Sequence, residues 1–295
     1  MTATTPRPFG RALCAMITPF TAAGELDLTA ARAHAAALVA DGCDGLVLSG
    51  TTGESPTTTD EEKTALLRAV REAVGDGVAL LSGVGSADTR HTLRLARRAE
   101  DAGADGLLVV TPYYSRPPRA AVEAHFLRVA EVSGIPLMLY DIPGRTGTRI
   151  GTESLLRLAE HPRVVAVKDC AYDLLGSTTV MSRTSLAYYS GCEELNLPLY
   201  ALGGAGYVST VANVAPRQMR APLDAFDAGR TGEAARLNAL TVRLTELMMA
   251  SGLPGTVTVK ALLSAGPVRE PLQPAGRGAA DGLREAYEEL LAAAR

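Results

Sequence analysis

Short apolar runs alternate with longer amphipathic segments along most of the chain. The runs are continuous, as in parallel strands covered on both faces. We predict strands over 13–17, 44–49, 78–81, 105–110, 136–140, 164–168, 186–189 and 206–209. The intervening segments begin at capping residues and end at glycines, which is typical of helices. We predict helices over 29–41, 60–74, 88–102, 119–132, 152–160, 174–182 and 194–202.

This alternation predicts an α/β fold, a (β/α)8 TIM barrel, because most strands follow one another at the spacing of a βα unit. A weak internal repeat supports this interpretation, since residues 42–48 resemble residues 103–109. The alternative, a doubly wound sheet, would place a glycine-rich phosphate loop after its first strand. Thr18-Pro19-Phe20 stands there instead.

The chain changes character after Pro216, where no further strand pattern is found. We predict helices over 217–228, 231–251, 256–264 and 281–293, with a Pro- and Gly-rich loop over 266–278. This is more than one closing helix. We therefore predict a barrel domain over 1–225, which carries the active site, and a C-terminal helical domain over 226–295.

Composition narrows the class of protein. The formal net charge is −3 and no basic block is present, so nucleic acid is not an expected partner. Residues 1–9 lack the apolar core of a signal peptide, and no apolar run reaches membrane-spanning length. Neither the four cysteines nor the four histidines show metal-ligand spacing. We expect a cytoplasmic protein without a membrane partner or a metal.

The most informative candidate residue is Lys168, which ends the apolar run 164–168. Desolvation favours the neutral, nucleophilic form of a lysine, and such an amine condenses with carbonyl groups. The alternative is a lysine at the end of a strand that reaches solvent. In barrels of this kind the chemistry lies where the strands end, so the following loops decide between the two.

Other polar groups follow the strands. Gly50-Thr51-Thr52-Gly53-Glu54 offers backbone N–H groups and hydroxyls to an anion, Tyr113-Tyr114 and Tyr140 offer phenols, and Arg145 suits a carboxylate. Taken singly, these also fit a polar turn, half-buried tyrosines and a surface arginine. Together with Lys168 they indicate Schiff-base chemistry on a carboxylate substrate, with phenols and a hydroxyl passing protons.

Four motifs resemble one known family in order and spacing. They are Gly50-Thr51-Thr52-Gly53-Glu54-Ser55, Thr111-Pro112-Tyr113-Tyr114, Tyr140-Asp141-Ile142-Pro143-Gly144-Arg145-Thr146-Gly147 and Val167-Lys168-Asp169. The chain resembles, over nearly its whole length, the dihydrodipicolinate synthase (4-hydroxy-tetrahydrodipicolinate synthase) family of pyruvate-dependent class I aldolases. The resemblance implies condensation of pyruvate with L-aspartate 4-semialdehyde in lysine and diaminopimelate biosynthesis.

The resemblance also implies roles for individual residues. Lys168 would form the imine with pyruvate, so that no separate cofactor is needed. Tyr140 and Thr51 would relay protons together with Tyr114, which would reach the site of a neighbouring subunit. A homo-oligomer, a tetramer built as a dimer of dimers, is the assembly that the resemblance implies.

Four further residues would bind substrate by the same resemblance. Thr52 would share the pyruvate carboxylate with Thr51, and Arg145 would bind the carboxylate of the semialdehyde. Gly191 and Val208 would contact substrate from the last two strands.

One departure leaves the second substrate open. Members of this family commonly have an acidic residue where Cys192 stands, followed here by Glu193. The alternatives are a pyruvate aldolase for another aldehyde or keto acid, and a non-catalytic barrel that binds a keto acid.

The resemblance bears on regulation as well. Tyr113 matches one residue of the lysine-binding site in feedback-sensitive members. The other positions hold Lys63, Ala87 and His91, from which we expect weak inhibition by lysine.

Overall fold

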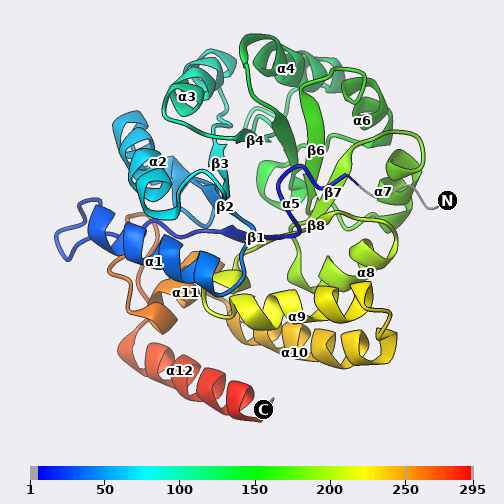
Figure 1. Cartoon of the computed structure of the whole chain (residues 1–295). Coiled ribbons are helices and arrows are strands. Elements are labelled where there is room, and N and C mark those ends of the chain that lie inside the picture. Colours follow the sequence, from blue (N-terminus) through cyan, green and yellow to red (C-terminus); the bar gives the residue numbers. More distant parts are fainter. Residues whose placement is uncertain (1–5, 250, 294–295) are drawn as a thin grey trace.

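The computed structural model describes residues 6–249 and 251–293 and contains eight parallel strands that close into a barrel (Figure 1). The strands are β1 (Ala12–Ala15), β2 (Gly45–Leu48), β3 (Ala79–Gly83), β4 (Gly106–Val110), β5 (Leu137–Asp141), β6 (Val164–Asp169), β7 (Ala187–Ser190) and β8 (Gly206–Ser209). Each pairs with the next, and β8 closes the barrel on β1. The predicted (β/α)8 barrel is thus confirmed. Two parts of the predictions fall outside the described residues. They are residues 1–5, within the N-terminal segment that lacks a signal-peptide pattern, and Ala250, within the predicted helix 231–251.

Helices surround the barrel and continue beyond it. They are α1 (Leu28–Ala40), α2 (Asp60–Val74), α3 (Thr89–Asp101), α4 (Arg119–Val132), α5 (Pro143–Thr146), α6 (Thr152–Leu158), α7 (Leu174–Met181), α8 (Asn196–Ala201), α9 (Pro216–Asp227), α10 (Thr231–Met249), α11 (Gly255–Leu263) and α12 (Arg277–Ala292). Three short 3₁₀ helices are η1 (Ser55–Thr57), η2 (Glu193–Leu195) and η3 (Val211–Asn213). No helix in the described ranges is long and apolar enough to cross a membrane.

Local side-chain chemistry explains where several helices begin. The Asp27 side chain accepts a hydrogen bond from Ala30 N at the start of α1, and Asp88 caps α3 in the same way. Thr59 and Glu62 form a complete capping box at the start of α2. These polar caps fix the direction in which each helix leaves its loop.

Several predicted bounds differ from those of the structure, and two of the differences are larger than a small shift at the end of an element. Residues 143–146, where no helix is predicted, form the short helix α5, because Pro143 is suited to the first position of a helix and Gly147 ends it in the left-handed conformation. Helix α12 begins at Arg277, inside the predicted loop, despite the glycine that follows. Burial of Ala280 holds this first turn in place.

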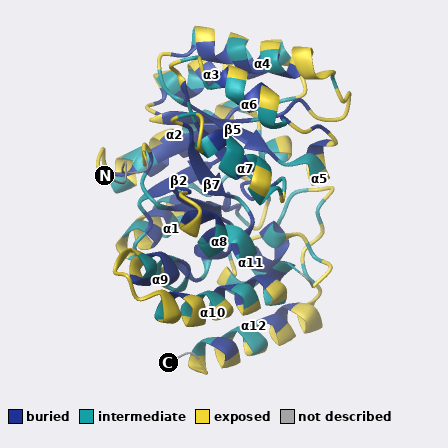
Figure 2. Ribbon diagram, turned by 90° about the vertical axis from the view of Figure 1, so that its right-hand side faces the viewer, coloured by how far each residue is buried: buried dark blue, intermediate teal, exposed yellow. Residues whose placement is uncertain are grey.

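The core has two layers. Apolar side chains between the strands and the surrounding helices form the outer layer, and strand residues that point into the barrel form the inner one. Figure 2 shows the resulting pattern, with buried strands at the centre and helices exposed only on their outer faces.

Three polar or aromatic side chains of the inner surface lie level with one another on adjacent strands: Tyr140, Lys168 and Tyr189. The fold therefore brings a lysine and a tyrosine side by side in the barrel.

The C-terminal helices pack against one side of the barrel. Helix α10 lies along α9, and α12 lies outermost (Figure 1). The predicted domain boundary after residue 225 falls inside α9, which runs to Asp227. The division into two domains stays a prediction.

Candidate active site

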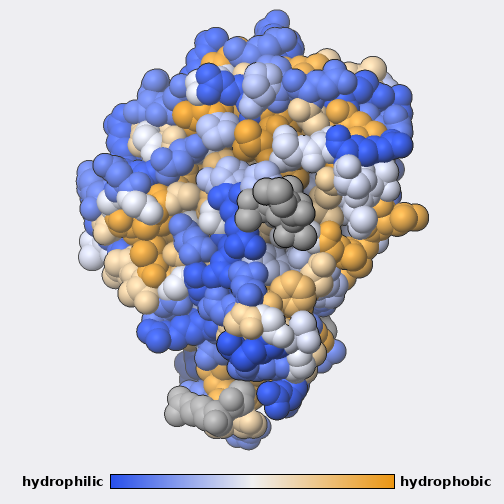
Figure 3. Space-filling view, turned by 45° about the vertical axis from the view of Figure 1, so that its right-hand side comes forward, coloured by the Kyte–Doolittle hydropathy of each residue, from blue (hydrophilic) through white to orange (hydrophobic). Residues whose placement is uncertain are grey.

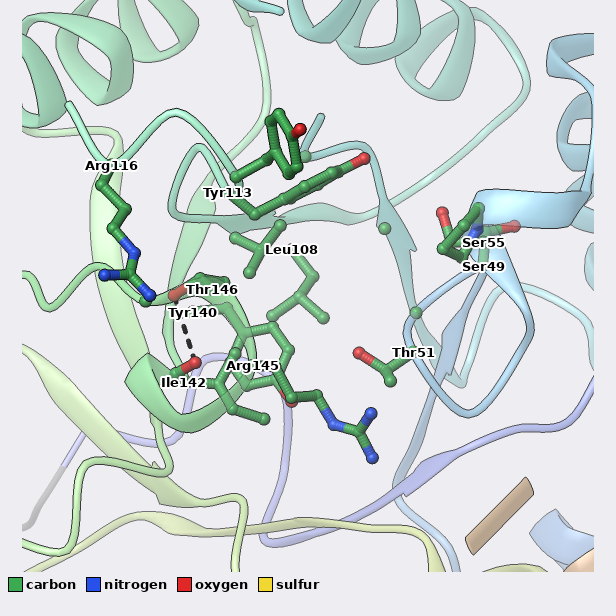
Figure 4. Close-up of a pocket in the computed structure, with 17 residues that line it drawn as sticks. Ser49, Thr51, Ser55, Leu108, Tyr113, Arg116, Tyr140, Ile142, Arg145 and Thr146 are labelled. Atoms are coloured by element: carbon green, nitrogen blue, oxygen red, sulfur yellow. Dashed lines mark hydrogen bonds between the residues drawn. The ribbon is translucent and has the colours of Figure 1, made fainter. Parts of the chain in front are cut away.

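A cavity of about 630 Å³ opens where β2, β4 and β5 end (Figure 4). Its lining includes five of the residues that the sequence singled out: Thr51, Tyr113, Tyr114, Tyr140 and Arg145. These side chains come from loops and strands far apart in the sequence. The barrel therefore brings together phenols, a hydroxyl and a guanidinium at one mouth, as expected of this fold.

Lys168 is not among the residues that line this cavity, but it lies beside Tyr140, which does line it. Only 6% of the residue is exposed, and its Nζ lies 4.4 Å from the centroid of the Tyr140 ring. Burial lowers the pKa of Lys168 below its usual value, while the nearby Cys170 and Glu193 act in the opposite direction. A larger share of the amine is therefore neutral and nucleophilic than in a lysine exposed to water.

Gly191 makes room for Lys168. A Cβ atom at position 191 would lie 2.8 Å from Lys168 Cε and would also collide with the Cys170 sulfur. Val208 is buried within the barrel among the inner-layer side chains. Neither residue lines the cavity, so a direct contact of Gly191 or Val208 with substrate stays a prediction.

Tyr140 is buried, and only 4% of the residue is exposed. Burial raises the pKa of Tyr140 well above its usual value, and Cys170 adds to this effect, whereas a hydrogen bond with Thr51 opposes it. The Cys170 thiol lies 4.0 Å from the phenol oxygen. The phenol is therefore protonated near neutral pH and can donate to a developing negative charge.

The loop after β2 presents backbone N–H groups and one hydroxyl to the cavity, rather than two hydroxyls. The Thr52 hydroxyl is 2.8 Å from the Thr210 hydroxyl and points away from the cavity lining, whereas the Thr51 side chain faces the cavity. Among the described residues, no acceptor is found for the backbone N–H groups of Thr51 and Thr52. Two adjacent N–H groups of this kind form a site for a carboxylate. Any contact of Thr52 with substrate is thus expected from its backbone.

Helix α5 places Arg145 at the cavity rim. The buried Thr111 hydroxyl donates to the Thr146 hydroxyl at 3.0 Å, which ties α5 to the end of β4. In Figure 4 the Arg145 guanidinium extends toward the side of the cavity where Thr51 lies. It is exposed and therefore available to an anionic ligand.

Tyr113 and Tyr114 also line the cavity, and in Figure 4 Tyr113 stands on the side opposite Arg145. Tyr114 is 95% exposed and has a left-handed backbone with φ 73°, which is unusual for a tyrosine. The loop thus directs one phenol away from the rest of the protein.

Sequence patterns missed several neighbours of the site. Ser49 and Arg116 line the cavity, and both have left-handed backbone conformations that no local motif announces. Cys170 contacts Tyr140 from the loop after β6. Because side chains alternate along a strand, its position two residues after Lys168 already indicated the same face. In the described part of the chain, no group of three His, Cys, Asp or Glu side chains is arranged to bind a metal ion.

The acidic residues that follow Cys192 after β7 are engaged elsewhere. Cys192 is buried, and Glu193 is turned toward the end of β8, where its Oε1 accepts from the Thr210 and Val211 N–H groups at 2.7 and 3.2 Å. Glu194 accepts a hydrogen bond from Tyr172. The neighbouring acids thus have structural partners and do not replace the missing one.

Comparison with known proteins agrees with this geometry. The model of the dihydrodipicolinate synthetase family matches residues 8–290. The chain belongs to the dihydrodipicolinate synthetase family. It is 69% identical to 4-hydroxy-tetrahydrodipicolinate synthase 1 of Streptomyces coelicolor over 97% of this chain and 95% of that protein.

Solved structures of this family share the fold. Dihydrodipicolinate synthase from Bacillus anthracis superposes with a TM-score of 0.92 at 35% identity, covering 95% of this chain and 98% of that one. The enzyme from Cyanidioschyzon merolae with lysine bound also has a TM-score of 0.92, at 34% identity, over 97% of this chain and 99% of its own. The family expected from the four motifs is thus confirmed.

Proposed function

We propose that this protein is a lyase that condenses pyruvate with L-aspartate 4-semialdehyde to form 4-hydroxy-tetrahydrodipicolinate, in lysine and diaminopimelate biosynthesis. The high identity to a 4-hydroxy-tetrahydrodipicolinate synthase supports this reaction. The observation that carries the mechanism is the buried amine of Lys168, 4.4 Å from the Tyr140 ring. A non-catalytic binding barrel would not need this pair.

The chemistry begins at Lys168. Its neutral amine attacks the keto carbon of pyruvate, and the former keto oxygen leaves as water with a proton from Tyr140. Loss of a proton from the pyruvate methyl group gives an enamine, whose carbon attacks the aldehyde. The aldehyde oxygen takes up a proton and becomes a hydroxyl, and the substrate amino group then displaces Lys168 and closes the ring.

The surrounding groups orient the two substrates for these reaction steps. The N–H groups of Thr51 and Thr52 bind the pyruvate carboxylate, the Thr51 hydroxyl links Tyr140 to the outer site, and Arg145 binds the carboxylate of the semialdehyde. Tyr114 completes the proton relay in a neighbouring subunit. The lysine imine takes the place of a cofactor. We assign the enzyme to the cytoplasm, where its four buried thiols stay reduced.

The choice of second substrate is tested with a panel of aldehydes and keto acids, each assayed with pyruvate. We expect aspartate semialdehyde to have the highest kcat/KM. The position of Cys192 makes a paralogous aldolase the second candidate. A higher kcat/KM with an uncharged aldehyde would establish that alternative.

Replacing Arg145 by alanine should reduce kcat/KM for aspartate semialdehyde by about 30-fold or more, because a charged carboxylate loses its partner. Lysine should substitute poorly, since it lacks the planar fork of guanidinium donors. Pyruvate should still be trapped by borohydride. Arg116, an exposed arginine of the same cavity, provides the matched variant. A greater loss in Arg116→Ala than in Arg145→Ala would contradict the assignment.

The working unit is expected to be a homo-oligomer, a dimer of dimers. The most exposed large apolar side chains of the described residues are Tyr114, Leu175, which is 81% exposed, and Tyr172. The face in Figure 3 carries its hydrophobic groups in separate patches. Leu175→Glu should reduce the mass measured by sedimentation velocity, because a buried charge destabilises an apolar interface. A fully active wild-type monomer would refute the proposal.

Lysine should inhibit only weakly. The Lys63 ammonium donates to the Ser55 and Thr58 carbonyl oxygens, and His91 pairs with Asp60 at 2.8 Å. These contacts leave a cationic ligand without an unpaired anion at either position. The measurement is the initial rate against L-lysine at saturating and at low pyruvate. Half-inhibition at submillimolar lysine would mean that other residues form an effective site.

A further inference from the structure

The loop that carries Thr51 and Thr52 ends in a strained, buried residue. Glu54 is only 2% exposed, and its backbone is left-handed, with φ 55°. A residue other than glycine keeps such a conformation only where its surroundings determine it. The contacts of the Glu54 side chain therefore help to set the shape of the loop.

Those contacts come from the C-terminal part of the chain. Glu54 Oε1 lies 2.5 Å from Lys260 Nζ on α11, with 1% and 3% of the two side chains exposed. Its other oxygen accepts a hydrogen bond from Arg269 N at 2.8 Å. Lys260 also donates to the Pro267 carbonyl at 2.7 Å. Because an unpaired buried carboxylate is costly, Lys260 strongly constrains where Glu54 can lie.

The same helix reaches the loop at a second point. The Thr256 hydroxyl, one turn before Lys260 on α11, donates to the Thr52 carbonyl oxygen at 3.2 Å. This bond turns the Thr52 carbonyl toward α11. Glu54 N in turn donates to the Thr51 carbonyl at 3.1 Å. Both threonines are thus connected to α11, while their own N–H groups remain available to a ligand.

An aromatic ring shields the ion pair. Lys260 Nζ lies 4.1 Å from the centroid of Phe20, and the Arg269 guanidinium carbon lies 4.1 Å from the same centroid. The pair is therefore screened little by water or salt. Its geometry is fixed by the packing of the C-terminal loop and helix against the barrel.

We propose that Lys260 is a positioning residue for pyruvate: its buried ion pair with Glu54 holds the Thr51 and Thr52 N–H groups in the orientation that binds the pyruvate carboxylate. Lys260 lies outside the cavity lining and acts only through the loop. The C-terminal helices thereby become part of the pyruvate site. This inference rests on the proposed function and names a further residue on which that site depends.

The test is Lys260→Met, assayed with both substrates. We expect KM for pyruvate to rise about tenfold or more, while KM for the semialdehyde changes less than twofold. The rate of borohydride trapping at low pyruvate should fall in proportion. Thr256→Val removes only the hydrogen bond to Thr52 and leaves no charge unpaired. A smaller rise confined to the pyruvate KM is expected there, which tests whether α11 acts on the loop even if Lys260→Met does not fold.

A partly buried ion pair at the other end of the barrel provides the control. Arg220 and Asp44 are 2.7 Å apart, and Asp44 immediately precedes β2. Arg220→Met should lower the thermal midpoint without changing the pyruvate KM. The proposal is overturned if Thr256→Val and any folded Lys260→Met protein keep the wild-type pyruvate KM. It is equally overturned if both KM values rise together. Absence of trapping in the wild-type protein would instead refute the proposed function.

Discussion

Lys168→Arg is expected to abolish the borohydride-stable adduct with pyruvate and to remove measurable turnover. Arginine is a cation of similar size, but its guanidinium stays protonated and cannot act as the amine nucleophile. In the wild-type protein, incubation with pyruvate and borohydride should add the mass of one reduced pyruvate unit to the peptide that contains Lys168. Peptide mass spectrometry measures both results.

Two other outcomes would contradict this assignment. An adduct on Lys260, the buried lysine that pairs with Glu54, would place the imine elsewhere. Turnover comparable to wild type in Lys168→Arg would exclude a covalent mechanism through this side chain. Circular dichroism and the thermal midpoint of the variant establish that the barrel remains folded.

The pH dependence of trapping tests the environment of Lys168 separately. Burial holds the pKa of Lys168 below its usual value, so the neutral amine accumulates at lower pH than in an exposed lysine. The rate of imine formation should therefore rise with pH and level off below the usual lysine pKa.

The barrel was predictable because each strand carries its own signal. Continuous apolar runs, capping residues such as Asp88 and glycines after helices are all local, and they repeat at the period of a βα unit. Lys168 was predictable for the same reason, since alternation along β6 places it on one face with Ala166. Boundaries failed where weak local preferences were outweighed by packing, as at the start of α12.

The contacts that support the site could not be predicted from local sequence patterns. Glu54 and Lys260 are 206 residues apart in the chain, and neither charge has a partner until α11 packs against the loop. The orientation of Thr52 likewise depends on Thr210 and Thr256. Sequence alone indicates that a threonine is present but not which of its groups faces the cavity. Such distinctions arise from tertiary packing.

Tyr140→Phe is expected to reduce kcat by about 10²- to 10⁴-fold, the usual contribution of a positioned proton donor. Only the hydroxyl is lost, so the ring remains beside Lys168 and pyruvate should still bind. Imine formation, measured by borohydride trapping, should persist at a reduced rate, because water can deliver the proton more slowly. The reduction in kcat should exceed any change in KM, since the phenol acts on the reacting atoms.

The matched control is Tyr189→Phe. Tyr189 is fully buried on β7, level with Lys168 and directly beside it in the barrel, but its hydroxyl donates to the Gly10 carbonyl at 3.0 Å. Loss of that bond should reduce stability by about 1 kcal/mol and leave kcat nearly unchanged. Comparing two tyrosines on the same inner surface separates a proton relay from simple packing. If both variants lose activity equally, or if Tyr140→Phe stays within twofold of wild type, Tyr140 does not transfer the proton.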